Sequence, residues 1–216
     1  SLRIDIGPGG KGKLKPGDRA VFATRFQQVG PSLVGKALDD RLGVATLIEL
    51  IKRRPRQIEL LAAFTVQEEV GLRGARVAGY ALQPDLAFAL DSTPSYDLPV
   101  WDGEENTRYN TRIGAGPAIY TVDGATINDP RLIRHLTQTA ETHGIPYQFR
   151  QPGGGGTDAG AIHKTRAGVP SVSISVPGRY QHTAAQFTRT ADWQHTLQLI
   201  FAALDGMDRS ILAAER

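Results

Sequence analysis

The chain has 216 residues, 40% hydrophobic and 22% charged, which supports one domain with a single buried core and excludes a disordered or fibrous protein. It contains no cysteine, so disulfides and thiolate metal sites are excluded, and any metal must be held by His, Asp or Glu. The net charge of +3 has no long block of one sign, and the cluster Lys52-Arg53-Arg54 fits a solvated helix end better than a nucleic-acid site. No apolar run could span a bilayer and residues 1–5 lack a signal-peptide pattern, so we expect a cytoplasmic protein with no membrane or nucleic-acid partner.

The first 36 residues have the pattern of short strands joined by turns. Residues 3–6 and 19–26 alternate between apolar and polar side chains, and Pro-Gly pairs interrupt the chain at 8–9 and 16–17. We expect no helix here and find no obvious partner for the first strand.

A helix is predicted over residues 42–54, where apolar side chains recur three apart and Pro55 follows. Asp39 and Asp40 stand at its N-terminal boundary. One of them can serve as an N-cap while the other interacts with the helix dipole, but two consecutive acids exceed what capping needs.

The run Ile58–Val66 is almost entirely apolar and delivers Glu68 and Glu69 into a turn that contains Gly71. A run without alternation predicts a central strand buried on both faces. Ligands bind at the carboxyl ends of strands in open α/β sheets, which is where this glutamate pair would lie. Glutamate pairs on helix faces are usually solvated, so the preceding apolar run is what favours a functional role.

Downstream of residue 70, helical and extended patterns alternate. Helices are predicted at 72–81, 130–143, 158–164 and 191–212, and strands at 85–90, 118–122, 147–150 and 169–176. The polar connection 95–116 is long for a compact domain, which indicates a functional loop or a small insertion. The alternation predicts a three-layer α/β domain with a largely parallel sheet.

Several side chains with metal-binding or acid–base chemistry directly follow a predicted strand or precede a predicted helix, so we expect them at one edge of the sheet. They are Asp39, Asp40, Glu68, Glu69, Asp91, Asp158 and His182. Carboxylates with one imidazole and no thiolate suit zinc, cobalt or manganese better than magnesium. An adjacent glutamate pair allows one carboxylate to bind metal while its neighbour accepts a proton from water.

Other candidate features have simpler explanations. The loop Gly153–Gly156 lacks the lysine and spacing of a phosphate-binding loop, so we interpret it as a conformational device near a site. The histidines other than His182 fall in helical stretches and are expected at the surface or in the core.

Seven ordered motifs resemble the signatures of the M42 family of dinuclear metallo-aminopeptidases, which includes TET enzymes and glutamyl aminopeptidases. They are Gly35-Lys36-Ala37-Leu38-Asp39-Asp40-Arg41-Leu42-Gly43, Gln67-Glu68-Glu69-Val70-Gly71, Leu90-Asp91, Gly114-Ala115-Gly116-Pro117, Ile145-Pro146-Tyr147-Gln148, Gly155-Gly156-Thr157-Asp158-Ala159 and Arg179-Tyr180-Gln181-His182-Thr183. The resemblance implies a zinc-peptidase-like α/β/α fold, peptide substrates, two zinc or cobalt ions, and homo-oligomers from dimer to dodecamer.

The resemblance also implies a role for each site residue. Asp39 would bridge two metals, with Asp40 beside it across an often cis peptide bond. Glu69 and His182 would complete one metal site, Asp91 would serve the other, and Glu68 would be the general base.

The sequence departs from the family pattern in two respects. It contains no His-x-Asp motif, which in the family supplies the last ligand of the Asp91 metal, and Gln186 stands where a glutamate is usual. We therefore expect residues 1–34 to be the end of an inserted β dimerisation domain, residues 35–216 to be the catalytic domain, and Ser1 to be a truncation or processing boundary.

The missing motif leaves three functional hypotheses open. The first is an aminopeptidase whose activity is impaired because this chain retains only one metal. The others are a non-catalytic member or fragment with an assembly or peptide-binding role, and a related metallo-deacylase or carboxypeptidase.

Overall fold

The computed structural model describes residues 5, 7–10, 12–104, 106 and 110–213. Its centre is a four-stranded sheet in the order β3-β6-β4-β5, formed by Ala87–Pro94, Ser171–Gly178, Ala118–Ile119 and Gln148–Phe149. β3 and β6 are parallel, as are β4 and β5, whereas β4 and β6 are antiparallel. The mixed α/β architecture confirms the predicted fold class.

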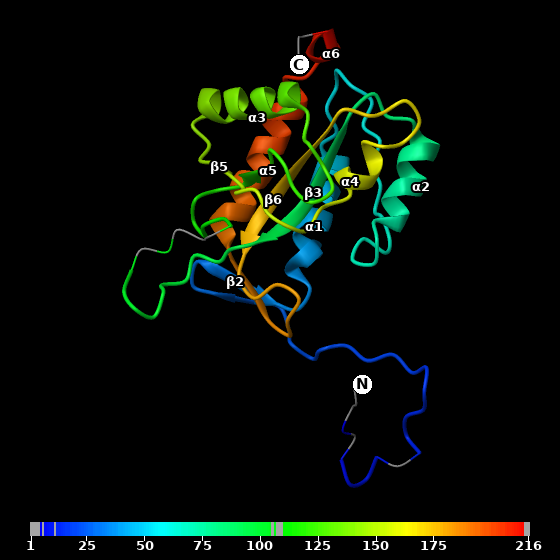
Figure 1. Cartoon of the computed structure of the whole chain (residues 1–216), viewed down its shortest axis with the longest axis vertical. Helices are drawn as coiled ribbons and strands as arrows, with labels where there is room; N and C mark the ends of the chain where they lie inside the picture. The colour runs from blue at the N-terminus through cyan, green and yellow to red at the C-terminus, as the bar shows by residue number, and fades with distance from the viewer. Residues whose placement is uncertain (1–4, 6, 11, 105, 107–109, 214–216) are drawn as a thin grey trace.

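Helices lie on both sides of this sheet (Figure 1). α1 (Leu38–Lys52) contacts β3, α5 (Thr190–Asp205) contacts β6, and α3 (Pro130–His143) packs on α5. α4 (Ala159–Ile162) contacts β3 and β6, and α2 (Arg73–Leu82) packs on α4. A last short helix, α6, covers Ser210–Ala213.

The core lies where β6 meets these helices. All eight residues of β6 are buried because β3 and β4 flank it and helices cover it. Leu50 from α1, Leu136 from α3 and Leu199 from α5 pack with Ile174 of β6 in one apolar cluster. Burying each of these side chains stabilises the fold by about 1.5–3 kcal/mol, so this cluster holds the sheet edge in place.

A second, antiparallel sheet has the order β1-β2-β7, formed by Gln27–Val29, Ser32–Gly35 and Gln186–Arg189. In this sheet Gly35 pairs with Gln186, which ties the segment before α1 to the segment after β6. Upstream of β1 the chain leaves the body as an extended segment (Figure 1). The boundary expected at residue 34 falls inside β2 and stays a prediction.

Most predicted elements are confirmed with changed bounds. The helix predicted at 42–54 corresponds to α1, Leu38–Lys52, which has non-helical backbone angles at Asp39 and Asp40. The helix predicted at 191–212 ends at Asp205 before a short α6. The strands predicted at 118–122 and 147–150 shrink to two residues each. The strand predicted at 3–6 lies largely outside the described residues. No described helix is long and apolar enough to cross a membrane.

Two strand predictions are wrong. Residues 58–66 form no strand, and Leu61, Phe64 and Val66 are exposed rather than buried on both faces. Residues 19–26 also form no strand. The physical reason is the same in both cases, because apolar or alternating side chains favour an extended chain but do not supply the hydrogen-bond partner that a strand requires.

Candidate metal centre

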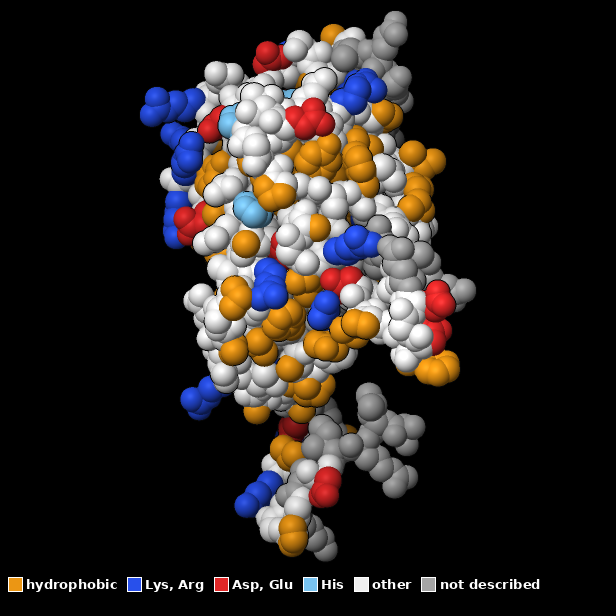
Figure 2. Space-filling view, turned by 90° about the vertical axis from the view of Figure 1, so that its left-hand side faces the viewer, with side chains coloured by type: hydrophobic (Ala, Val, Ile, Leu, Met, Phe, Trp, Pro, Cys, Tyr) orange, Lys and Arg blue, Asp and Glu red, His pale blue; other side chains and the backbone are white. Residues whose placement is uncertain are grey.

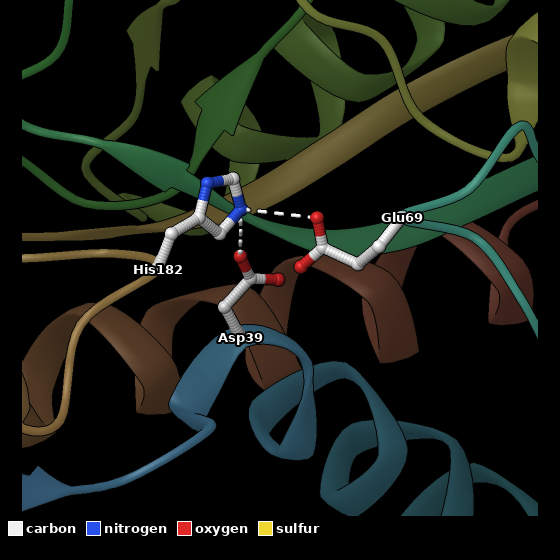
Figure 3. A group of neighbouring side chains, drawn as sticks. All are labelled: Asp39, Glu69 and His182. Carbon is white, nitrogen blue, oxygen red and sulfur yellow. Dashed lines mark ion pairs between the residues drawn. The ribbon is translucent and has the colours of Figure 1, made fainter. Parts of the chain in front are cut away.

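Three side chains from distant parts of the sequence converge beside the carboxyl end of the central sheet (Figure 3). Asp39 lies at the start of α1, Glu69 in the turn before α2, and His182 in the connection between β6 and β7. His182 Nε2 lies 3.3 Å from Asp39 Oδ2 and 3.2 Å from Glu69 Oε2. One ligand atom from each residue lies within 4.8 Å of the others, close enough to share a metal ion.

The two consecutive aspartates at α1 have different tasks. They are joined by a cis peptide bond. Both have non-helical backbone angles, so regular helical geometry begins after Asp40. Asp40 Oδ1 accepts a hydrogen bond from the Gly43 main-chain N–H at 2.9 Å, as an N-cap does. Asp39 is therefore free to point toward His182.

Gly43 allows Asp40 to take this position. A Cβ atom at residue 43 would lie 2.3 Å from Asp40 Oδ2 and 2.7 Å from the Leu90 carbonyl oxygen. The glycine of the Asp-Asp-Arg-Leu-Gly motif thus permits α1 to approach the end of β3, which brings Asp39 and Asp40 close to Asp91.

Gln186 fixes the main chain of Asp39 from the other side. It is 4% exposed, and its Oε1 accepts the Asp39 N–H at 2.6 Å across 147 residues of sequence. In the sequence Gln186 stands out only as a departure from a family pattern. Its position in β7, paired with Gly35 of β2, brings it to Asp39.

Left-handed backbone conformations cluster at the site. Ala37, Gln67 and His182 have φ values of 50°, 61° and 58°, although none is glycine. Such conformations cost about 1–3 kcal/mol and persist where the surrounding structure enforces them. They turn the chain two residues before Asp39, directly before Glu68 and at His182 itself.

Glu68 lies beside the three converging residues. Partial burial, together with the negative charges of Asp158 and Glu69, raises the pKa of Glu68 to about 7. A carboxyl group with this pKa can take and release a proton near neutral pH.

Asp91 and Asp158 complete the acidic group. Asp91 lies in β3 next to Asp39, and burial raises its pKa well above the usual range, as does the charge of Asp40. Asp158 accepts a hydrogen bond from the Thr65 hydroxyl through Oδ2, whereas its buried Oδ1 has no hydrogen-bond partner among the described residues.

Among the described residues, no ion pair joins a Lys or Arg to these carboxylates. His182 is the one basic side chain that pairs with them there, through Asp39 and Glu69. A buried oxygen without a partner and two carboxylates facing one imidazole fit a divalent cation such as zinc or cobalt. The residues present therefore fit a metal.

The remaining candidates from the sequence lie elsewhere or serve the structure. His135, His143 and His163 each place a ring nitrogen against a main-chain carbonyl oxygen. Residues 153–156 pack against the turn at Gly124, where the Gly124 N–H donates to the Gly155 carbonyl oxygen at 2.9 Å. Thr65, which the sequence did not single out, immediately precedes the glutamate turn and reaches Asp158.

Comparison with known proteins identifies the family of this chain. The model of the M42 glutamyl aminopeptidase family matches residues 1–199. The chain belongs to this family. A relative from Acetivibrio thermocellus is 36% identical over 208 residues, which is 94% of this chain and 62% of that protein. A glutamyl aminopeptidase from Lactococcus lactis is 36% identical over 157 residues, which is 71% of this M42 chain and 42% of that enzyme.

Solved structures of aminopeptidases superpose well on this chain. Aminopeptidase APDkam598 from Desulfurococcus kamchatkensis superposes with a TM-score of 0.82 at 34% identity, over 89% of this chain and 54% of that one. The TET1 peptidase of Pyrococcus horikoshii can assemble into a tetrahedron or a large octahedral shell. It superposes with a TM-score of 0.73 at 34% identity, over 90% of this chain and 56% of that one. The chain spans about half the length of these solved relatives.

Proposed function

We propose that this chain carries the metal centre of an M42 metal-dependent aminopeptidase that removes N-terminal residues from peptides. The observation that carries the proposal is the convergence of Asp39, Glu69 and His182 on one point. Family membership supports the reaction class, and the names of the relatives support removal of N-terminal residues.

In this proposal Asp39, Glu69 and His182 would hold one zinc or cobalt ion. Asp39 and Asp91 would hold a second. A divalent cation supplies Lewis-acid chemistry, because it polarises a peptide carbonyl and lowers the pKa of water.

The protein itself moves the proton. Glu68 stands next to the ligand Glu69 but is not one of the converging three, and its pKa of about 7 suits a general base. It takes a proton from the attacking water and passes it to the departing amine. General acid–base groups contribute roughly 10²–10⁴-fold to rate, which sets the scale for its removal.

The second metal position is the weaker one in this proposal. Only Asp39 and Asp91 reach it from this chain, since the sequence contains no His-x-Asp motif. The activity of the 216-residue chain is therefore expected to be low. The relatives described as a dodecamer or a tetrahedral or octahedral shell also support a homo-oligomeric state.

Hydrolysis of aminoacyl chromogenic substrates with added cobalt tests the reaction. Glu68→Gln should lower kcat by roughly 10²–10⁴-fold because it removes the proton acceptor without changing side-chain size. Glu49→Gln changes a half-exposed glutamate of α1 that forms an ion pair with Lys52; it is the matched control and should leave the rate unchanged. Turnover of substrates with a blocked N-terminus would indicate a deacylase or carboxypeptidase, and no turnover by the chain or by any longer form would favour a peptide-binding role.

Calorimetric titration with zinc or cobalt tests the metal site independently of activity. Loss of a residue that only orients a metal ligand weakens metal binding by roughly 10–100-fold. His182→Ala removes a proposed ligand itself, so it should weaken metal binding by more than that. His143→Ala removes an exposed histidine of α3 and should change nothing. Unchanged affinity in His182→Ala would disprove the assigned ligand set.

A further inference from the structure

The main-chain N–H of Asp39, at the start of α1, has its hydrogen-bond acceptor on a distant strand. The first N–H groups of a helix have no acceptor within the helix, and the side chain of the N-cap residue often supplies one. In α1 the N-cap is Ala37, whose side chain makes no such bond. Gln186 Oε1 accepts the Asp39 N–H instead, at 2.6 Å, and Gln186 is 4% exposed.

This acceptor holds the main chain of Asp39 while its carboxylate serves the metal centre. Asp40, the next residue, uses its own Oδ1 to accept the Gly43 N–H within α1. The Asp39 carboxylate instead faces His182, with Oδ2 lying 3.3 Å from the ring Nε2. A ligand at a helix start needs both a fixed main chain and a free carboxylate, and Gln186 supplies the first without using the second.

The strand that carries Gln186 also closes the loop that carries His182. The Arg179 N–H donates to the Phe187 carbonyl oxygen at 2.8 Å, and the Phe187 N–H donates to the Arg179 carbonyl oxygen at 3.1 Å. The Thr188 hydroxyl donates to the carbonyl oxygen of Pro177, which ties β7 to the end of β6. Gln186 therefore lies at the base of the His182 loop and contacts Asp39 from there.

The small antiparallel sheet fixes Gln186 on its other side. Gln186 pairs with Gly35 of β2, four residues before Asp39. The extended chain before β1 leaves the body at this sheet (Figure 1), and Figure 2 shows that segment projecting from the same end of the molecule. The sheet thus holds both the segment that enters α1 and the loop that carries His182, and the Gln186 side chain joins the two directly.

We propose that Gln186 is a positioning residue that couples Asp39 to the His182 loop and thereby sets the metal affinity of the centre. The inference rests on the proposed function, because Asp39 and His182 are ligands only in that proposal. Ligands that are held in place before binding lose less freedom when the ion arrives, so affinity rises. Gln186 acts through the main chain of Asp39, and its neutral amide adds no further negative charge to the acidic group.

Calorimetric titration with zinc tests the positioning role. Gln186→Leu removes the acceptor with little change in volume and should weaken zinc binding by roughly 10–100-fold. Gln186→Asn keeps the amide but shortens its reach by one methylene group, so it should weaken binding in the same way. Gln186→Glu keeps an acceptor oxygen at the original reach and adds an attractive charge, so it should bind zinc at least as tightly as the original protein.

Gln148→Leu is the matched control. Gln148 Oε1 also accepts a main-chain N–H from a distant segment, that of Arg112 at 2.8 Å, but it lies in β5, at the opposite edge of the sheet from β3. A purely structural role would lower the stability of Gln186→Leu and Gln148→Leu alike and change zinc affinity in neither. Unchanged affinity in Gln186→Leu or Gln186→Asn, or a Gln186→Glu variant that binds as weakly as Gln186→Leu, would overturn the proposal.

The same titrations separate this inference from the proposed function. If the original protein binds no zinc, or if His182→Ala binds it equally well, the metal site and this inference both fail. If zinc binds, His182→Ala weakens it and Gln186→Leu does not, only the positioning role of Gln186 fails.

Hydrogen exchange measured by NMR in EDTA tests the contact without any metal. In the unmodified protein the Asp39 N–H should exchange at least about tenfold more slowly than exposed loop N–H groups, because a buried, hydrogen-bonded N–H exchanges only when the structure opens. Gln186→Glu should keep this protection and Gln186→Asn should lose it. Fast exchange of the Asp39 N–H in the unmodified protein would show that Gln186 does not hold Asp39, whatever the folding of the variants.

Discussion

Buried acidic side chains have different neighbours in two regions of this molecule: hydrogen-bond donors in one, and other carboxylates in the other. Away from the metal centre each buried carboxylate has donors. Asp129 forms a double hydrogen bond with Arg131, and Asp192 accepts the N–H groups of Gly114 and Gly116 at 2.8 and 2.9 Å. At the end of the central sheet Asp39 and Asp91 instead face other carboxylates, and their pKa values are raised by burial and by their neighbours' charges.

The difference shows what each region depends on. The paired acids hold two chain segments together and are complete within the protein. The grouped acids repel one another and weaken the metal-free fold, and either protonation or a bound cation would relieve this repulsion. Neutralising an acid should therefore have opposite effects on stability in the two regions.

The largest effect is expected at Asp192, which is fully buried at the start of α5. Asp192→Ala leaves the N–H groups of Gly114 and Gly116 without acceptors and should lower the free energy of unfolding by about 3 kcal/mol. Asp205→Ala removes a half-exposed acid at the other end of α5 and should cost about 0.5 kcal/mol or less. Denaturant titration of both variants measures the difference, and equal losses would remove the distinction between the regions.

A smaller effect of opposite sign is expected at Asp91. In EDTA, Asp91→Asn should raise the free energy of unfolding by about 1–2 kcal/mol, because it removes one of several buried, mutually repelling carboxyl groups. Asp85→Asn changes an exposed acid just before β3 and should have no effect. Added zinc or cobalt should stabilise the original protein more than Asp91→Asn, and a less stable variant in EDTA would show that Asp91 supports the metal-free fold.

Much of the site could be predicted from the sequence because its residues follow recognisable elements. Asp39 and His182 lie beside a predicted helix start and a predicted strand end that the structure contains, and the structure brings them together with Glu69. Glu69 joins them although the strand predicted before it does not form. The two aspartates of α1 show how far such reasoning extends. The sequence indicated that only one could cap the helix, but the choice of Asp40 depends on its approach to Gly43, a contact that spacing does not specify.

The apolar run 58–66 shows where prediction from the sequence failed. Its composition favours a buried strand, yet no main-chain hydrogen bond joins residues 58–65 to another described residue, and Phe64 and Val66 are exposed. Gln186 was equally hard to assign, since its contact with Asp39 joins residues 147 apart. Both depend on long-range partners, which local patterns do not contain.

The smallest predicted effect concerns Asp97, a paired acid that supports the metal centre indirectly. Asp97 Oδ1 accepts a hydrogen bond from Arg179 Nε at 2.8 Å, at the start of the loop that carries His182, and its Oδ2 accepts the Ile113 N–H at 2.9 Å. Burial alone would raise the pKa of Asp97, but these hydrogen bonds outweigh it and the pKa is lowered.

A carboxyl group with a lowered pKa stabilises the fold above its unfolded pKa of about 3.9, and this contribution is lost as the pH falls through the folded pKa. Asp97→Asn should therefore cost about 1 kcal/mol at pH 7 and almost nothing near pH 2, since the protonated acid and the amide then resemble each other. Asp102→Asn, an exposed acid in the same connection, should show no such dependence. If the cost of Asp97→Asn were the same at both pH values, its effect would arise from packing, and Asp97 would not belong with the charge-paired acids.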